Sequence, residues 1–264
     1  MAGRGRAQRS PAPGGSKGTI DRALDILEYL REAVLPQRLA DIAGATGLSP
    51  SSAHRILAAL SRRAYVYRNP LTRRYSLGFQ VFDLGETGSA MMTTTRRSRP
   101  ALVRLAADIG ATVLIGTRNG TRVALLDRAD PPPRQGRGSV PLGRYVDAHA
   151  TAIGKALLAW TDPAEVLALY EGMQLTRHTP RTVATRETLV EELAATRRRG
   201  HGEEEGEMAA GVSGIAVPLV NLAGEVYLAF WVVFPTAERP RDMRRVLARL
   251  KATEREVSEY QPLG

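Results

Sequence analysis

The 264-residue sequence contains no cysteine. This absence excludes disulfide bonds, thiolate catalysis and zinc or iron–sulfur sites with cysteine ligands. Histidine is also scarce, and no two histidines are spaced four residues apart as they are on the metal-binding face of a helix. The four histidines are His54, His149, His178 and His201. We therefore expect no metal and no other cofactor.

Long apolar runs are missing as well. No run approaches the roughly 18 apolar residues that cross a membrane. The first 18 residues, MAGRGRAQRSPAPGGSKG, lack the apolar segment of a secretory signal. Hydrophobic residues make up 43% of the chain and charged residues 24%, which is ordinary for a globular protein, and the length favours two domains. We expect a cytoplasmic protein without a membrane partner.

Acidic residues are few in the first third of the chain. Residues 1–80 hold 13 Lys and Arg against five Asp and Glu, a net charge of +8, whereas residues 81–264 hold 24 against 22. A small domain with this imbalance is expected of a surface that binds phosphate groups. Solubility is the alternative explanation. Codon bias would account for the small number of lysines, but not for the uneven distribution.

The chain begins with a basic segment and then shows helical spacing. Residues 1–18 are rich in Gly, Pro, Ser and Arg and predict a disordered arm, in which Lys17 is a candidate DNA contact. Apolar spacing predicts a first helix over 20–32, with Thr19 as its N-cap. Pro36 is expected in the first turn of a second helix.

The stretch GLSPSSAHRILAAL, residues 47–60, predicts the second half of a helix-turn-helix. Gly47 fits a left-handed turn, and Ser49 fits the N-cap of a third helix with Pro50 at its first position. The β-prone segment AYVYRNPLTRRYSLG follows, with Asn69-Pro70 at its bend. A basic hairpin after the third helix is typical of a winged helix-turn-helix.

The remainder predicts a second, α+β domain, so that the fold class is α/β with several domains. Apolar alternation and turn residues, such as Asn119-Gly120, predict hairpins over 111–127 and 212–234. Helices are expected over 151–160, 163–171, 186–199 and 241–260, and RADPPPRQGRGSV is expected to be a loop. We expect a helical segment from 81 to 110, interrupted near Pro100. The predicted parts are an arm (1–18), a winged helix-turn-helix domain (19–80), a linker helix (81–98) and the α+β domain (99–264).

Several polar residues are candidates for contact with double-stranded operator DNA. The start of a recognition helix reaches base edges, while hydroxyl groups and wing arginines bind phosphates. The alternative is that the serines only cap the helix and that the arginines are solvated. The candidates, besides Lys17, are Ser49, Ser51, Ser52, His54, Arg55, Arg73 and Arg74.

Six stretches of the sequence, three in each domain, together resemble the isocitrate lyase regulator (IclR) family of bacterial transcription factors. In the first domain these are TIDRALDILEYL, LADIAGATGLSPSSAHRILAAL and RRYSLG. In the second they are DAHATAIGKALLA, TLVEELAATRRRGHGEEEGEMAAGVSGIAVPL and AGEVYLAFWVVFP. The resemblance implies a GAF-like effector-binding second domain, assembly into dimers or tetramers, and operator binding modulated by a small molecule.

The resemblance also assigns an effector pocket, position by position. It places Ala152, Ile153, Gly154, Glu204, Val212, Trp231 and Val233 there. Family members that bind small organic acids have two hydroxyl side chains where this chain has Trp231 and Val233. The change suits a larger or more apolar ligand than a small carboxylate, because fewer donors replace the hydration of a carboxylate. A cavity filled by its own side chains is the alternative.

Two features are compatible with an enzyme. The acidic residues 203–205 and 207 lie close to His201, and Thr151 and Lys155 stand four residues apart. A solvated acidic loop and a lysine that supports the helix or covers its end are the simpler explanations. We expect a DNA-binding transcriptional regulator and no enzyme. The alternatives are a ligand-independent DNA-binding regulator and an enzyme built on the GAF-like domain.

Overall fold

The computed structural model describes residues 18–87, 90–132, 145–221 and 223–259. It divides into two compact units, residues 1–89 and residues 90–264, and each unit is described by itself. Lys17 and most of the loop predicted over 128–140 lie outside the described residues. No described helix is long and apolar enough to cross a membrane.

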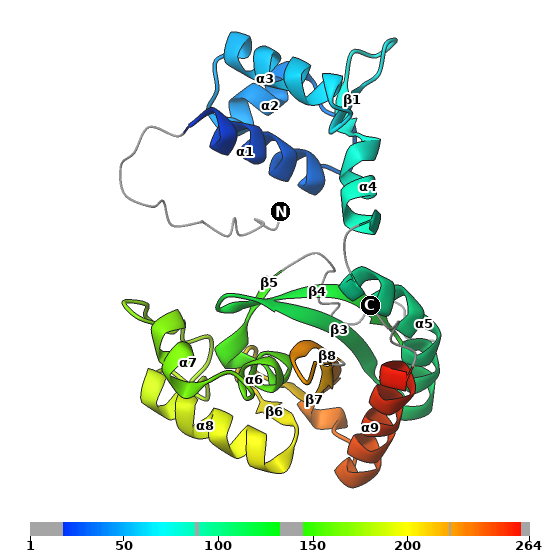
Figure 1. Cartoon of the computed structure of the whole chain (residues 1–264), viewed down its shortest axis with the longest axis vertical. Helices are drawn as coiled ribbons and strands as arrows, with labels where there is room; N and C mark the ends of the chain where they lie inside the picture. The colour runs from blue at the N-terminus through cyan, green and yellow to red at the C-terminus, as the bar shows by residue number, and fades with distance from the viewer. Residues whose placement is uncertain (1–17, 88–89, 133–144, 222, 260–264) are drawn as a thin grey trace. The chain divides into compact units, whose positions relative to one another are not determined.

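Three helices form the core of the first unit (Figure 1). They are α1 (Thr19–Glu32), α2 (Leu39–Thr46) and α3 (Pro50–Arg62). Ile26, Ile42 and Leu57 are fully buried between them. The prediction of Thr19 as N-cap was wrong: Gly18 holds that position, and its N–H donates to Asp21 at 3.0 Å.

The turn between α2 and α3 follows the prediction. Gly47 has a φ of 68°, in the left-handed region that glycine enters without strain. Ser49 is the N-cap of α3, where its Oγ accepts from the N–H of Ser52 at 3.3 Å, and Pro50 occupies the first turn. Pro36, however, does not open α2, because the N-cap is Arg38.

The segment before α2 instead pairs with the wing. The wing consists of strands β1 (Val66–Arg68) and β2 (Tyr75–Leu77), which pair antiparallel. Gln37 exchanges two main-chain hydrogen bonds with Tyr75, at 2.8 and 2.7 Å, and so adds a short bridge to the edge of β2. Helix α4 (Phe79–Thr87) follows the wing.

The second unit contains a six-stranded antiparallel sheet in the order β5-β4-β3-β8-β7-β6. Both predicted hairpins are present, and Gly120 takes a φ of 61° in the turn of the first. The strands are β3 (Thr112–Asn119), β4 (Arg122–Ala129), β5 (Tyr145–Asp147), β6 (Gly202–Glu205), β7 (Val212–Val220) and β8 (Val226–Pro235).

Helices cover both faces of this sheet and enclose two apolar cores (Figure 1). One face is covered by α6 (Ala152–Leu158), with α7 (Pro163–Leu169) and α8 (Arg186–Arg199) packed beside it. The other is covered by α5 (Ala90–Ile109) and α9 (Met243–Glu259). The interruption expected near Pro100 was wrong, since α5 continues through this exposed proline.

Candidate functional site

The recognition-helix candidates lie on the start of α3. Ser51, His54 and Arg55 are exposed, whereas Ala53, Ile56 and Leu57 on the opposite face are buried. Hydroxyl groups of the serines join the cap, because the Oγ of Ser49 donates to that of Ser52 at 2.9 Å. The exposed polar surface at the start of α3 is formed by His54, Arg55 and Ser51, whose Oγ lies 3.1 Å from that of Ser49.

The two wing arginines differ in their surroundings. Arg73 is exposed and has a φ of 57°, which is strained for any residue with a Cβ. The guanidinium of Arg74 is half-buried and donates to the main-chain oxygen of Pro36 at 3.0 Å. Arg74 thus supports the wing, and Arg73 presents a charge at the bend.

Of the positions assigned to an effector, Glu204 of β6 and Trp231 and Val233 of β8 lie near Gly214 of the strand between them, β7. Across these strands Glu204 pairs with Gly214, and Gly214 pairs with Val233. Trp231 is two residues from Val233 and belongs to the same face, which packs against α6. Ala152, Ile153 and Gly154 form the buried start of α6, and Val212 is half-buried at the start of β7.

Gly214 lies between the indole of Trp231 and the carboxyl of Glu204. An added Cβ at Gly214 would be 2.3 Å from Trp231 Nε1 and 2.9 Å from Glu204 Oε1. Trp231 is 2% exposed and fills this space. Within the described chain, neither its Nε1 nor the oxygens of Glu204 make a hydrogen bond of normal geometry.

Glu204 is buried although it lies in the acidic stretch. Burial, together with the charge of Glu207, raises the pKa of its carboxyl to about 8, although Lys155, the Ala152 N–H and the Trp231 indole lower it in part. The expectation of a solvated loop was wrong, because residues 202–205 form strand β6 and alternate between the buried and exposed faces.

Lys155 is the centre of an ionic cluster and does not cover a helix end. Its side chain is 2% exposed. Its Nζ donates to Glu207 Oε1 at 2.6 Å and to the main-chain oxygen of Glu203 at 3.0 Å, and lies 3.7 Å from Glu192. Glu192 in turn accepts from Arg199 at 2.7 Å. A role for Lys155 as a free base is therefore not supported.

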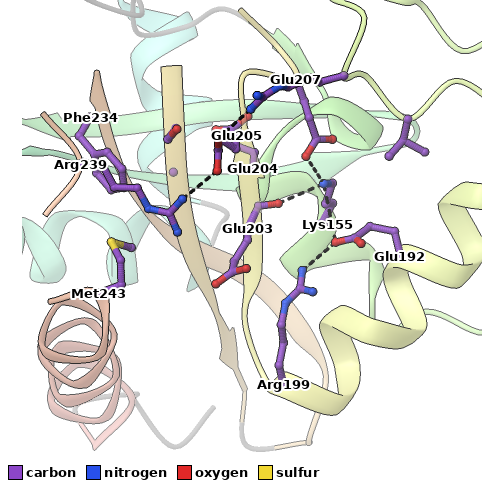
Figure 2. A pocket seen from close by; sticks show the side chains of 14 residues that line it. Lys155, Glu192, Arg199, Glu203, Glu204, Glu205, Glu207, Phe234, Arg239 and Met243 are labelled. Atoms are coloured by element: carbon purple, nitrogen blue, oxygen red, sulfur yellow. Dashed lines mark hydrogen bonds and ion pairs between the residues drawn. The ribbon is translucent and has the colours of Figure 1, made fainter. Parts of the chain in front are cut away.

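This cluster lines a cavity of about 270 Å³ next to β6 (Figure 2). Its lining is mostly charged, and this argues against the apolar ligand expected from Trp231 and Val233. Sequence reasoning named Lys155 only as a residue compatible with an enzyme, and it did not single out Glu192. A lysine inside the apolar run AIGKALLA is the signal that could have revealed burial. The charged residues that line the cavity are Lys155, Arg181, Glu192, Arg199, Glu203, Glu204, Glu205, Glu207 and Arg239.

Two histidines that are distant in the sequence stack on each other. The ring centroids of His149 and His178 are 6.1 Å apart, and His178 Nε2 lies 2.8 Å from Asp147 Oδ2. Burial lowers the pKa of His149. Across the described ranges, no group of three or more His, Asp or Glu side chains is placed to hold a metal ion.

Comparisons with known protein families cover both units. Residues 19–70 match the IclR helix-turn-helix domain, and residues 90–259 match the bacterial transcriptional regulator IclR C-terminal domain. The chain is 33% identical over 211 residues to the HTH-type transcriptional regulator XynR of Escherichia coli, covering 80% of this chain and 83% of the relative. It is 33% identical over 217 residues to BhcR of Paracoccus denitrificans, covering 82% and 77%.

Solved structures have the same architecture. An IclR transcriptional regulator from Alicyclobacillus acidocaldarius gives a TM-score of 0.76 at 27% identity, covering 92% of this chain and 98% of the other. An IclR homologue from Microbacterium hydrocarbonoxydans, complexed with 4-hydroxybenzoate, gives 0.78 at 22% identity with the same coverage. The helix-turn-helix unit, the effector-domain fold and these relatives agree: the chain belongs to the IclR family of DNA-binding bacterial transcriptional regulators.

Proposed function

We propose that this regulator contacts the base edges of operator DNA with the start of α3 and binds the adjacent DNA phosphates with its wing. The supporting observation is the row of exposed polar residues Ser51, His54 and Arg55 on a helix whose other face is buried. Arg55 can bond the major-groove edge of a guanine with both of its terminal nitrogens. Arg73 contributes a phosphate contact, while Ser49, Ser52 and Arg74 fix the elements that carry these groups.

The test is the affinity for the operator, found by selecting bound fragments of genomic DNA. Arg55→Ala should weaken specific binding at fixed salt by about 1 to 3 kcal/mol, the usual value of a good base contact. Arg244→Ala, an exposed arginine of α9, removes the same charge from the other unit and serves as control. Equal affinities for the Arg55 and Arg244 variants would refute the recognition-helix assignment.

We further propose that the chain acts as a dimer or tetramer in the cytoplasm, so that paired recognition helices meet paired half-sites. Helix α4 supports self-association. Phe79 is 75% exposed and Phe82 is 69% exposed, and large exposed apolar patches mark interaction surfaces. Sedimentation with and without operator DNA tests this proposal; a monomer bound to DNA would contradict it.

For the second unit we propose a small-molecule ligand that changes operator affinity. The ligand reaches Glu204 from the charged cavity, because Trp231 occupies the space beside Gly214. The same filled space favours a second candidate, a regulator that needs no ligand. A melting-temperature screen against metabolites separates the two, since a ligand at 100 times its Kd adds about 2.7 kcal/mol of stability.

We also propose that the second unit binds its ligand without converting it. The support is the use of Lys155 in an ionic cluster and the naming of the relatives as regulators. Incubation of the protein with any ligand found in the screen, followed by mass analysis, tests this directly. Turnover of the ligand would favour the enzyme alternative.

A further inference from the structure

The cavity beside β6 contains carboxyl oxygens that lack donors. Glu204 is only 4% exposed and lines the cavity, and neither of its carboxyl oxygens has a hydrogen-bond partner among the described residues. Oε2 of Glu207 is also buried without a partner, while its Oε1 accepts from Lys155. Three carboxyl oxygens therefore lack a hydrogen bond of normal geometry and face a molecule that enters the cavity.

The cationic side chains that line the cavity already face carboxylates. An incoming anion would have to compete with these pairs, and it would also meet Glu204 and Glu207. The chemistry of the cavity therefore favours a ligand that donates hydrogen bonds. The pairs are Arg181 and Arg239 with Glu205, Arg199 with Glu192, and Lys155 with Glu207.

A positive charge suits Glu204 and the oxygen of Glu207 that Lys155 leaves open better than a neutral donor does. Burial and the negative charge of Glu207 both oppose ionisation of Glu204. A cation bound beside them would offset this repulsion, whereas a neutral hydroxyl group would leave it in place. An organic cation fits better than a metal ion, because within the described ranges these carboxylates are not grouped as metal ligands.

We propose that this cavity binds a small organic cation that carries an ammonium or guanidinium group, with Glu207 and, once the cation is bound, ionised Glu204 as its counter-charges. The inference rests on the proposed function only in assigning effector binding to the second unit. A volume of about 270 Å³ is close to the lower limit for ligand sites, so the cation is a small one. Lys155 holds Glu207 in place for it.

Titration calorimetry on the full chain tests the charge preference with matched probes. The probes are 1,4-diaminobutane and agmatine as cations, 1,4-butanediol as the neutral analogue, and succinate as the anion. We expect at least one cation to bind, and the diol and succinate to bind at least about tenfold more weakly. This factor corresponds to the lower end of what a hydrogen bond to a charged group contributes.

Two conservative variants locate the site. Glu204→Gln keeps the size of the side chain and should weaken binding of the cation by about tenfold or more. Glu207→Gln should also weaken binding of the cation, and it tests the site if Glu204→Gln does not fold. The control is Glu191→Gln, an exposed residue of α8 outside the cavity, which should bind as the wild type does.

The proposal is overturned if neither cation binds, if succinate binds in a way that depends on Glu204, or if Glu204→Gln and Glu207→Gln both fold and bind the cation normally. Measuring operator binding with the same protein preparations distinguishes failure of the cation proposal from failure of the proposed function. A protein that binds its operator and no cation refutes only the ligand class. A protein that binds the cation but no DNA refutes the regulatory role.

Discussion

The indole of Trp231 lies beside the carboxyl of Glu204, over a glycine on the neighbouring strand. Gly214 has no side chain, and an added Cβ there would be 2.3 Å from the indole nitrogen. The three residues come from three adjacent strands, and their fit depends on the register in which Gly214 pairs with both Glu204 and Val233. One large side chain therefore fills the space that a missing side chain leaves open.

This arrangement predicts that Gly214→Ala destabilises the second unit by about 1 to 3 kcal/mol, the usual cost of overfilling a packed site. Both tryptophans, Trp160 and Trp231, belong to this unit, so tryptophan fluorescence during urea unfolding reports its stability. Adding Trp231→Leu should recover part of the loss, because the clash is with the indole. Additive effects of the two substitutions would rule out this clash as the cause.

A second prediction concerns pH. Glu204 has a pKa of about 8 in the folded chain against an ordinary value of 4.5, so folding retains a proton that the unfolded chain releases. The stability provided by the protonated form is fully present below about pH 4.5 and is lost as the pH rises to about 8. Between pH 5.5 and 8, the free energy of unfolding of Glu204→Gln should therefore rise relative to that of the wild type by on the order of 2 kcal/mol.

The measurement is the free energy of unfolding by urea at several pH values for both proteins. The free energy of unfolding of the variant should still depend on pH to some extent, because burial also raises the pKa of Glu207. For the control Glu191→Gln, the curve of unfolding free energy against pH should run parallel to that of the wild type. Parallel lines for Glu204→Gln and the wild type would show that Glu204 is ionised in the folded protein at neutral pH.

A third prediction concerns the buried lysine. Lys155→Met should destabilise the second unit by about 3 to 5 kcal/mol, because it leaves Glu207 without its cation and leaves Glu192 with Arg199 alone. Glu207→Leu in addition should restore much of this stability, since it removes the unpaired charge. Lys251→Met, a half-buried lysine of α9, is the control and should change the urea midpoint little.

The wing supplies a fourth prediction. Arg73→Gly should release the strain of a positive φ and stabilise the first unit by up to about 1 kcal/mol, while it weakens DNA binding. Loss of one phosphate contact should reduce the slope of log K against log salt by about 0.9. Arg73→Ala should weaken DNA binding equally without stabilising the unit. Unchanged salt dependence in both variants would show that Arg73 does not contact DNA.

Most helices and hairpins could be predicted from the sequence because their apolar residues repeat with a clear period. Short elements whose hydrogen-bond partners are distant in the sequence could not be predicted in this way. The bridge at Gln37 depends on Tyr75, which is 38 residues away, and it moves the start of α2 from Pro36 to Leu39. Strand β6 carries glutamates on both of its faces, so its burial pattern follows from packing against α6.

Of the residues that line the cavity, the resemblance assigned Glu204 to an effector site, and the chemistry of the cavity could not be predicted. The resemblance identified Glu204 and Trp231, yet a side chain's size does not tell whether it lines a space or fills it. Glu203 and Glu204 are neighbours with opposite environments, because adjacent residues of a strand point to opposite faces. The charges that surround Lys155 come from α8 and from the segment after β6, about 37 to 52 residues later in the chain.

The bridge between Gln37 and Tyr75 helps to fix the position of the wing relative to α3. The Oε1 of Gln37 also accepts from the hydroxyl of Tyr29, and the guanidinium of Arg74 is fixed to Pro36. The wing is therefore fastened at its base to the scaffold that carries α3. We expect a recognition helix and a wing held at a fixed separation to bind DNA best when its groove width and phosphate spacing match that separation.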